Sequence, residues 1–201
     1  MKYLFVVLLS LVAQSSLAAR ILYDRITNDE GLSNSSVNVI FRDSRNYMWF
    51  GTWDGLNRYD GTNMVCYNND PGDPNSLSSN RVRDILEQRD GILWVATDHG
   101  INRMDLDRNR IRRYYLGYES LVPSIENAYS ITTASGVLVC SVYEWGLAGF
   151  SEEEDEFYPI VIPRLNTFDI RRICAGRDSQ LWILTTHGLF CAPYRVKEGR
   201  I

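Results

Sequence analysis

The sequence has few of the residues on which most enzyme sites depend. It contains two histidines and four cysteines in 201 residues. It shows no metal-ligand spacing, no nucleophile turn and no glycine-rich phosphate loop. It also lacks a long apolar run after its first twenty residues, so no later membrane-crossing segment is expected. We therefore predict no catalytic site, no metal site and no cofactor in this chain.

An excess of positive charge is missing as well. The 21 lysines and arginines are outnumbered by 25 acidic residues, which gives a formal net charge of −4. The basic residues are spread along the chain without a patch, so nucleic-acid binding is not indicated. One acidic run, Glu152 to Asp155, falls where a turn is expected, and we interpret it as a solvated loop.

The first residues have the pattern of an export signal. Lys2 is followed by an apolar run from Tyr3 to Ala13 and by small residues near Ala18. The run is about half of the roughly twenty residues needed to span a bilayer, although an uncleaved anchor is an alternative. We predict a signal peptide over residues 1–19 and an exported chain that begins near Ala19 or Arg20.

What is present is an internal repeat. Trp49, Trp94 and Trp182 are separated by 45 and 88 residues and stand in similar surroundings. The segment Val37–Asp60 aligns without a gap on Val82–Asp105. A period of roughly 40–45 residues with strand-forming composition, and without long amphipathic helices, is typical of β-propeller blades.

Two further copies are weaker. Residues Ile170–Leu189 align with the second copy at a constant offset of 88. The copy Ala128–Phe150 keeps Gly146, but it has Cys140, or Val139 after a shift, where a tryptophan is expected. The sequence therefore contains four repeats, of which the third is degenerate.

Each copy divides at turn residues into four strand-like runs. We predict an all-β fold, a β-propeller of four-stranded antiparallel blades over residues 20–201. Four blades are at the lower end of the usual range of ~4–8, so we expect an incomplete propeller that forms an open arc. The run 21–27 is expected to complete a blade, either the fourth or one that this sequence lacks. The expected blades cover about residues 32–70, 77–118, 124–162 and 166–201.

Two kinds of residue recur at fixed positions of the repeat. A glycine closes the same turn in every copy, which predicts a positive φ there. The repeated tryptophans are expected to pack between neighbouring blades, with ligand stacking as the alternative. The glycines are Gly55, Gly100, Gly146 and Gly188.

Four cysteines in an exported protein raise the possibility of disulfides. Cys174 and Cys191 belong to the first and third strands of one expected blade, so a strand separates them. Their Cα atoms would then be ~10 Å apart, beyond the ~7 Å that a disulfide can bridge. Cys174 takes the place of Phe41 and Leu86 in other copies and is therefore predicted to be a small core residue. We expect four free, mostly buried thiols.

The segments Gly31–Val37 and Trp49–Asp60 resemble the two-component regulator propeller repeat. Leu77–Val82 and Leu93–Thr97 repeat the pattern, the fourth copy keeps part of it, and the third lacks its arginine. The resemblance implies a periplasmic sensor of a hybrid histidine kinase of the kind that gut Bacteroidetes use to respond to glycans. It also implies an inner-membrane anchor, a kinase and further domains as partners. We interpret the sequence as an N-terminal fragment of such a protein.

Turn and linker residues on one rim of the propeller are the expected ligand site. Exposed aromatic rings beside acid, amide and arginine groups suit an oligosaccharide, because rings stack on the apolar face of a sugar and polar groups bind its hydroxyls. A secreted propeller enzyme that acts on polysaccharide, and a protein-interaction scaffold, are the alternatives. A homodimer is also possible. The candidate binding residues are Trp53, Asp54, Arg81, His99, Glu144, Trp145 and His187.

Overall fold

The chain is described by a computed structural model that covers residues 23–116, 128–142, 146–163, 165 and 170–201. Its strands form four antiparallel sheets, in the order in which they occur in the sequence. The strands of blade 1 are β1 (Val37–Arg42), β2 (Met48–Thr52), β3 (Gly55–Tyr59) and β4 (Met64–Tyr67), and those of blade 2 are β5 (Val82–Arg89), β6 (Ile92–Thr97), β7 (Gly100–Asp105) and β8 (Arg110–Tyr114). Blade 3 consists of β9 (Ala128–Ala134), β10 (Val137–Val142), β11 (Gly146–Ser151) and β12 (Glu156–Ile160), and blade 4 of β13 (Ile170–Ala175), β14 (Gln180–Thr185) and β15 (Gly188–Pro193).

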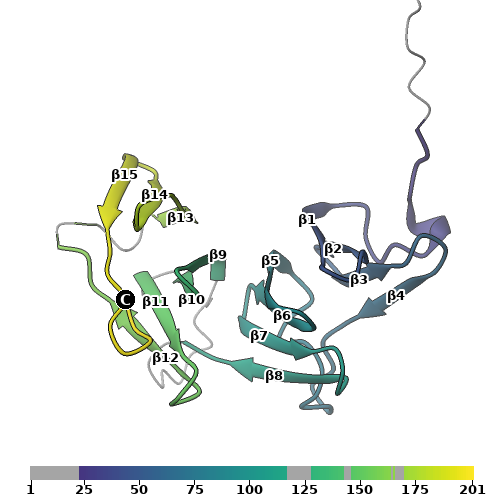
Figure 1. The fold of residues 1–201 in the computed structure, drawn as a ribbon. Coiled ribbons are helices and arrows are strands. Elements are labelled where there is room, and N and C mark those ends of the chain that lie inside the picture. Colours follow the sequence, from purple (N-terminus) through teal and green to yellow (C-terminus); the bar gives the residue numbers. More distant parts are fainter. Residues whose placement is uncertain (1–22, 117–127, 143–145, 164, 166–169) are drawn as a thin grey trace, which may run out of the picture.

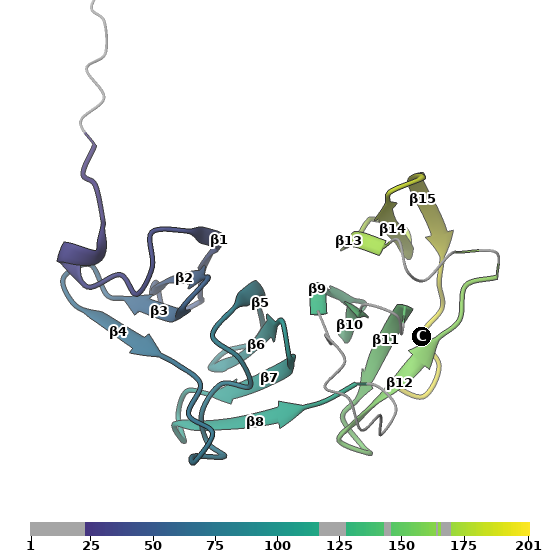
Figure 2. The ribbon, with the colours of Figure 1, turned by 180° about the vertical axis from the view of Figure 1, so that it is seen from behind.

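The four blades stand side by side along an arc whose two ends do not meet (Figure 1). The first strand of each blade lies on the inner side of the arc, and β4, β8 and β12 lie on its outer side (Figure 2). The architecture is therefore an incomplete β-propeller, as the sequence period predicts.

One expectation about blade completion is wrong in this structure. Residues 23–27 are not in a strand, and they lead into a short 3-10 helix, Asn28–Glu30, beside blade 1. Blade 4 is at the other end of the arc, so residues 23–27 do not complete it (Figure 1). Among the described residues, blade 4 has three strands and β15 has no partner on its outer side. The segment 1–19 lies outside the described residues.

The turn between the second and third strands of each blade depends on glycine. Gly55, Gly100, Gly146 and Gly188 have φ values of 118°, 93°, 89° and 144°. A Cβ on Gly100 would also lie 2.6 Å from the carbonyl oxygen of Tyr114. The predicted positive φ is confirmed, and at Gly100 the close approach of the backbone gives a second reason for glycine.

The repeated tryptophans form the contacts between blades. Trp49 is buried between blades 1 and 2 with Val82 and Val95, and Trp94 is buried between blades 2 and 3 with Phe150. In blade 3 the same position is held by Val139, which is buried against blade 4. Cys140 does not take this position: Val139 lies three residues before the strand end at Val142, as Trp94 lies three residues before Thr97. The shift of one residue relative to the turn glycine arises because three residues, and not two, separate the second strand from that glycine in blade 3.

Trp182 departs from this pattern. Its ring is 39% exposed, whereas Trp49 and Trp94 are 0% exposed. The expectation that all three tryptophans are buried is therefore wrong for Trp182. The physical reason is that no blade in the described part of the chain covers the face of blade 4 on which Trp182 lies (Figure 1).

Two of the cysteines are exposed for the same reason as Trp182. All four are free, as expected, but only Cys140 is buried, so the prediction of mostly buried thiols is wrong. Cys174 and Cys191 are exposed because they flank Trp182 on the uncovered face of blade 4. Burial raises the pKa of the Cys140 thiol well above its ordinary value.

Blades 1 and 2 each contain a cluster of polar side chains that anchors the preceding linker to the middle of the sheet. The backbone N–H of Ser78 donates to Asn102 Oδ1 at 2.8 Å, and Asn102 Nδ2 donates to Ser78 Oγ at 2.9 Å. Ser78 Oγ is also 3.0 Å from Thr97 Oγ1. Blade 1 repeats the arrangement with Ser33, Asn57 and Thr52.

Inner strands of neighbouring blades are joined by hydrogen bonds from side chain to backbone. Asn38 Nδ2 donates to the carbonyl of Val82 at 2.8 Å, which joins β1 to β5. Asp84 Oδ2 accepts the N–H of Ile131 at 3.0 Å and the hydroxyl of Ser130 at 3.1 Å, which joins β5 to β9. Burial raises the pKa of Asp84, although these donated hydrogen bonds oppose the shift.

We predict that Trp94→Ala lowers the free energy of unfolding by about 3–5 kcal/mol, because it opens a cavity between blades 2 and 3. Trp53→Ala is the matched control, since the same truncation at a ring that is 49% exposed removes little buried surface. Urea denaturation followed by tyrosine and tryptophan fluorescence measures both. Equal losses in the two variants would contradict the assignment of Trp94 to the core between blades.

A second prediction concerns pH. Because the pKa of Asp84 is raised in the folded state, its ionisation opposes folding as the pH rises from the unfolded value of about 3.9 through the folded one. The stability of the wild type relative to Asp84→Asn should therefore decrease from pH 4 to pH 7. Asp90 provides a control of opposite sign, since Arg45 lowers its pKa and its contribution is lost as the pH falls. Urea denaturation of wild type, Asp84→Asn and Asp90→Asn from pH 2 to pH 7 checks both slopes: the effect of Asp84 appears above about pH 4 and that of Asp90 below it. The same trend with pH for both variants would contradict the assignment.

Candidate ligand-binding rim

The turn between β2 and β3 and the linker before β5 meet on one rim of the arc. Trp53 lies in the turn of blade 1, and the guanidinium carbon of Arg81 lies 4.4 Å from the centroid of its ring. The indole N–H of Trp53 donates to Asn38 Oδ1 at 2.9 Å. Trp53 is thus held by a cation on its ring and by an amide at its edge, while almost half of it stays accessible.

Asp98 fixes the arginines beside this ring. Its carboxylate lies 3.3 Å from Nη1 of Arg81 and accepts Nη2 of Arg83 at 3.0 Å, and Nε of Arg83 makes a further short contact. The Asp98 side chain is mostly buried, and Arg81 is the more exposed of the two arginines. Because one carboxylate faces two guanidiniums, the group keeps a net charge of +1, and its exposed guanidinium, that of Arg81, lies at the rim.

Backbone hydrogen bonds explain why turn and linker share a rim. The N–H of Trp53 donates to the carbonyl of Ser36 at 3.2 Å, and that of Asp98 donates to the carbonyl of Arg81 at 3.0 Å. These two bonds are the same contact in successive repeats. Asp54 completes the rim by accepting Nδ2 of Asn80 at 2.9 Å.

The structure brings only some of the predicted binding residues together. Trp53, Asp54 and Arg81 lie together, whereas His187 is on blade 4, where its Nδ1 is 3.0 Å from Thr186 Oγ1. His99 directs its ring to Tyr115, with centroids 5.2 Å apart, on the outer side of blade 2. Two of the predicted residues, Glu144 and Trp145, lie outside the described residues.

Two residues of the rim are missing from the sequence prediction. Asn38 and Arg83 belong to the inner strands β1 and β5, whereas the candidates come from turns and linkers. Both occupy the second position of the first strand in their repeats, 45 residues apart. Strand alternation combined with the repeat offset could have assigned them to this rim.

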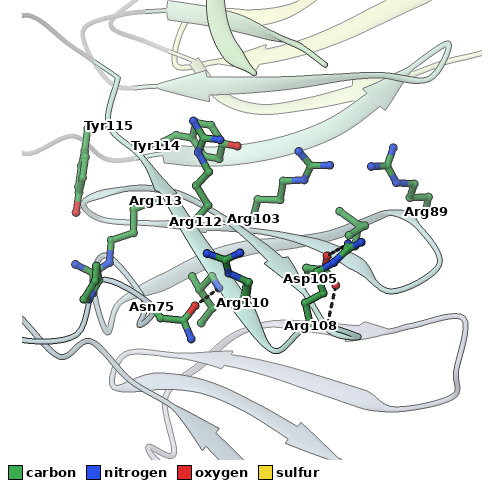
Figure 3. Close-up of a pocket in the computed structure, with 13 residues that line it drawn as sticks. Asn75, Arg89, Arg103, Asp105, Arg108, Arg110, Arg112, Arg113, Tyr114 and Tyr115 are labelled. Atoms are coloured by element: carbon green, nitrogen blue, oxygen red, sulfur yellow. Dashed lines mark hydrogen bonds and ion pairs between the residues drawn. The ribbon is translucent and has the colours of Figure 1, made fainter. Parts of the chain in front are cut away.

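A basic groove lies on the outer side of blade 2 (Figure 3). It has a volume of about 760 Å³, and Tyr115 stands at the end nearest to His99. The expectation that the chain has no basic patch is wrong at this place, because strand pairing sets Arg103 beside Arg112 and Asp105 beside Arg110. The arginines that line the groove are Arg89, Arg103, Arg108, Arg110, Arg112 and Arg113.

About half of this positive charge is compensated, since three carboxylates, those of Asp105, Glu152 and Asp155, pair with arginines of the groove. Asp155 accepts the hydroxyl of Tyr114 at 2.7 Å and pairs with Arg112 and Arg103, and Glu152 pairs with Arg103 at 3.4 Å. The run that includes Glu152 and Asp155 is therefore not a purely solvated loop, because it joins blade 3 to blade 2.

Other arginines of the groove serve the local structure. Arg113 donates to the carbonyls of Asp73 and Ser76 at 2.6 and 2.7 Å and so holds the loop before blade 2. Arg108 pairs with Asp105 at 2.7 Å and lowers the pKa of that carboxyl. These arginines of the groove therefore hold the contact between blades 2 and 3 and the loop before blade 2.

The described residues hold no group of three or more His, Cys, Asp and Glu side chains that could bind a metal ion. Within the same part of the chain, no helix has the length and apolar character needed to cross a membrane.

Two of the repeats match the model of a known protein family. The family model for the two-component regulator propeller matches residues 31–54 and 76–99, which contain the first two strands of blade 1 and of blade 2. A stretch of 70 residues is 41% identical to histidine kinase P4 of Formosa agariphila. That stretch is 35% of this chain and 5% of the kinase.

Solved structures show the same fold. The extracellular domain of BT4673 from B. thetaiotaomicron, a protein described as a hybrid two component system, superposes over 90% of this chain with a TM-score of 0.72 and 19% identity. PorZ, a component of the type-IX secretion system of Porphyromonas gingivalis, superposes over 84% with a TM-score of 0.59 and 12% identity. The chain spans 24% and 22% of these two structures.

Proposed function

We propose, on the basis of the two-component regulator propeller repeats that the chain contains, that it is part of the ligand-sensing propeller of a hybrid two-component histidine kinase. The sensor would lie in the periplasm after export through the segment 1–19. It would bind an oligosaccharide at the rim and pass the signal to the remaining domains of the kinase. The fold shared with the extracellular domain of BT4673 supports this proposal.

The observation that carries the proposal is the accessible ring of Trp53 beside Arg81, Asp54 and Asn80. The apolar face of a pyranose stacks on an indole, and its hydroxyls accept from a guanidinium or amide and donate to a carboxylate. Arg81 also suits the carboxylate of a uronic acid, because a guanidinium binds a carboxylate through two parallel hydrogen bonds.

The position of the rim suggests how binding could be transmitted. Trp53 and Asp54 belong to blade 1, whereas Arg81 lies in the linker before blade 2 and Asp98 in the turn between β6 and β7. A ligand that contacts both blades binds most tightly to one relative placement of them. It would therefore shift the population of the sensor toward that placement.

Two other classes of function predict different behaviour. A secreted propeller enzyme would need an acid, base or nucleophile arranged around the ligand, and among the described residues the two histidines are on blades 2 and 4. A scaffold would bind a protein and no sugar. Turnover of polysaccharide distinguishes the enzyme, and failure of every small ligand to bind distinguishes the scaffold.

We predict that Trp53→Ala and Arg81→Ala each weaken oligosaccharide binding at least about tenfold, which corresponds to about 1.4 kcal/mol. Titration calorimetry with neutral, uronic-acid and sulfated oligosaccharides measures the effect. Lys197→Ala is the control, because this exposed side chain on the C-terminal segment is distant in sequence from the rim.

The outcomes separate the hypotheses. Binding that is equal in both variants and in wild type would remove Trp53 and Arg81 from the site. New reducing ends in the same mixtures would favour the enzyme. Trp145→Ala and Glu144→Ala test the two predicted residues that the structure does not describe.

A further inference from the structure

The basic groove of blade 2 holds more positive charge than its contacts use. Its six arginines face three carboxylates, those of Asp105, Glu152 and Asp155, so half of the positive charge has no partner of opposite sign. The whole chain has a formal net charge of −4, so the groove is opposite in sign to the molecule that carries it. A cleft lined by charge of one sign concentrates ions of the other sign.

Arg110 is the arginine of the groove with the least structural use. It is exposed, and within the described part of the chain no hydrogen bond or ion pair joins it to another residue. Asp105 lies opposite Arg110 in the pairing of β7 with β8, but its carboxylate pairs with Arg108 at 2.7 Å and accepts the backbone N–H groups of Asp107 and Arg108. The donors of the Arg110 guanidinium are therefore available to a ligand.

Arg112 presents a second guanidinium on the same side of β8. Residues two apart in a strand face the same side, with Cα atoms roughly 7 Å apart. Arg112 pairs with Asp155, but its side chain is 62% exposed, so a ligand can reach it beside that carboxylate. Figure 3 shows Arg110 and Arg112 along the same groove. Each guanidinium can bind one oxyanion group through two parallel hydrogen bonds.

The other blades show that the fold does not require an arginine at this place. The residue three positions after the turn glycine pairs with Val65 in blade 1, with Arg112 in blade 2 and with Tyr158 in blade 3. In blade 2 that pairing sets Arg112 directly opposite Arg103, and like charges in opposite positions destabilise a strand pair. An arrangement that opposes folding and that the repeat does not need is expected at a functional site.

The groove also has the size and lining of a site for a small molecule. Its volume of about 760 Å³ is within the range of roughly 300–1,000 Å³ that is usual for such sites. Ile92, Ile111 and Tyr114 line it together with the arginines and offer apolar surface to the carbon skeleton of a ligand. This combination suits an organic anion.

We propose that the groove binds a small organic molecule that carries two or more oxyanion groups, either carboxylate, sulfate or phosphate. Arg110 and Arg112 bind these groups, and the remaining positive charge of the groove attracts them. The site is separate from the rim around Trp53, because Asp98 of the rim precedes β7 and Asp105 of the groove ends that strand. The inference therefore does not depend on the proposed sensor function.

Titration calorimetry of the full chain with citrate, pyrophosphate and ethanedisulfonate tests the proposal, at an ionic strength held constant with sodium chloride. We expect saturable binding of at least one of the three, and the strongest of them identifies the oxyanion that the groove prefers. Arg110→Ala should weaken this binding at least about tenfold, because it removes hydrogen bonds between charged groups. Arg177→Ala is the matched control, since this exposed arginine lies between β13 and β14 of blade 4. Circular dichroism of each variant establishes that the blades remain folded.

Removal of a competing carboxylate should have the opposite effect. Glu152 lies 3.4 Å from Arg103 and 3.8 Å from Arg89, so Glu152→Gln releases positive charge in the groove and should tighten binding several-fold. Glu153→Gln is the control for the change in net charge, because Glu153 is exposed and makes no ion pair within the described residues. A purely structural role of the arginines would not produce tighter binding.

Three results would overturn the proposal. The first is the absence of saturable binding for all three anions. The second is an equal loss of affinity in Arg110→Ala and Arg177→Ala, which would show general ionic attraction and no site. The third is an equal effect of Glu152→Gln and Glu153→Gln, which would show that the carboxylate at the groove does not compete with the ligand.

Discussion

Packing of one side chain of the second strand against the next blade is the contact on which the rest of this structure depends. A four-stranded sheet with apolar residues on both faces cannot be stable alone in water, because each face must be removed from solvent. Trp49, Trp94 and Val139 achieve this in turn along the arc. The blades are therefore held as a row in which each is stabilised by its neighbours, as in other repeat proteins.

The candidate binding site also depends on the packing of blade 1 against blade 2. The linker from blade 1 to blade 2 has to return from the outer strand to the inner strand, and the buried cluster of Ser78, Asn102 and Thr97 anchors it to the sheet. Once the linker is fixed, Arg81 comes to lie over Trp53 of the preceding blade. A binding surface that spans two blades thus arises from the residues that make the repeat fold.

The strands, turns and interblade role of Trp49 and Trp94 could be predicted from the sequence because they depend on local pattern and on the repeat period. The exposure of Trp182 could not, since the pattern fixes which side of a sheet a residue faces and not whether anything covers that side. The basic groove was missed for a related reason. Five of its six arginines lie within residues 103–113, but the sequence does not show which of them share one side of the sheet. The pairing of β7 with β8 sets Arg103 beside Arg112, and both approach Asp155 of blade 3.

The two kinds of interblade contact respond differently to solution conditions. The apolar contacts around Trp49 and Trp94 are insensitive to ionic strength, whereas the contacts of Arg103 and Arg112 with Glu152 and Asp155 are partly exposed and are weakened by salt. Inner strands are joined by buried hydrogen bonds such as those of Asp84, and outer strands by these ion pairs. High salt should therefore loosen the outer side of the arc between blades 2 and 3 first. An anion that binds the arginines of the groove would compete with Glu152 and Asp155 and would weaken the same contact between blades 2 and 3.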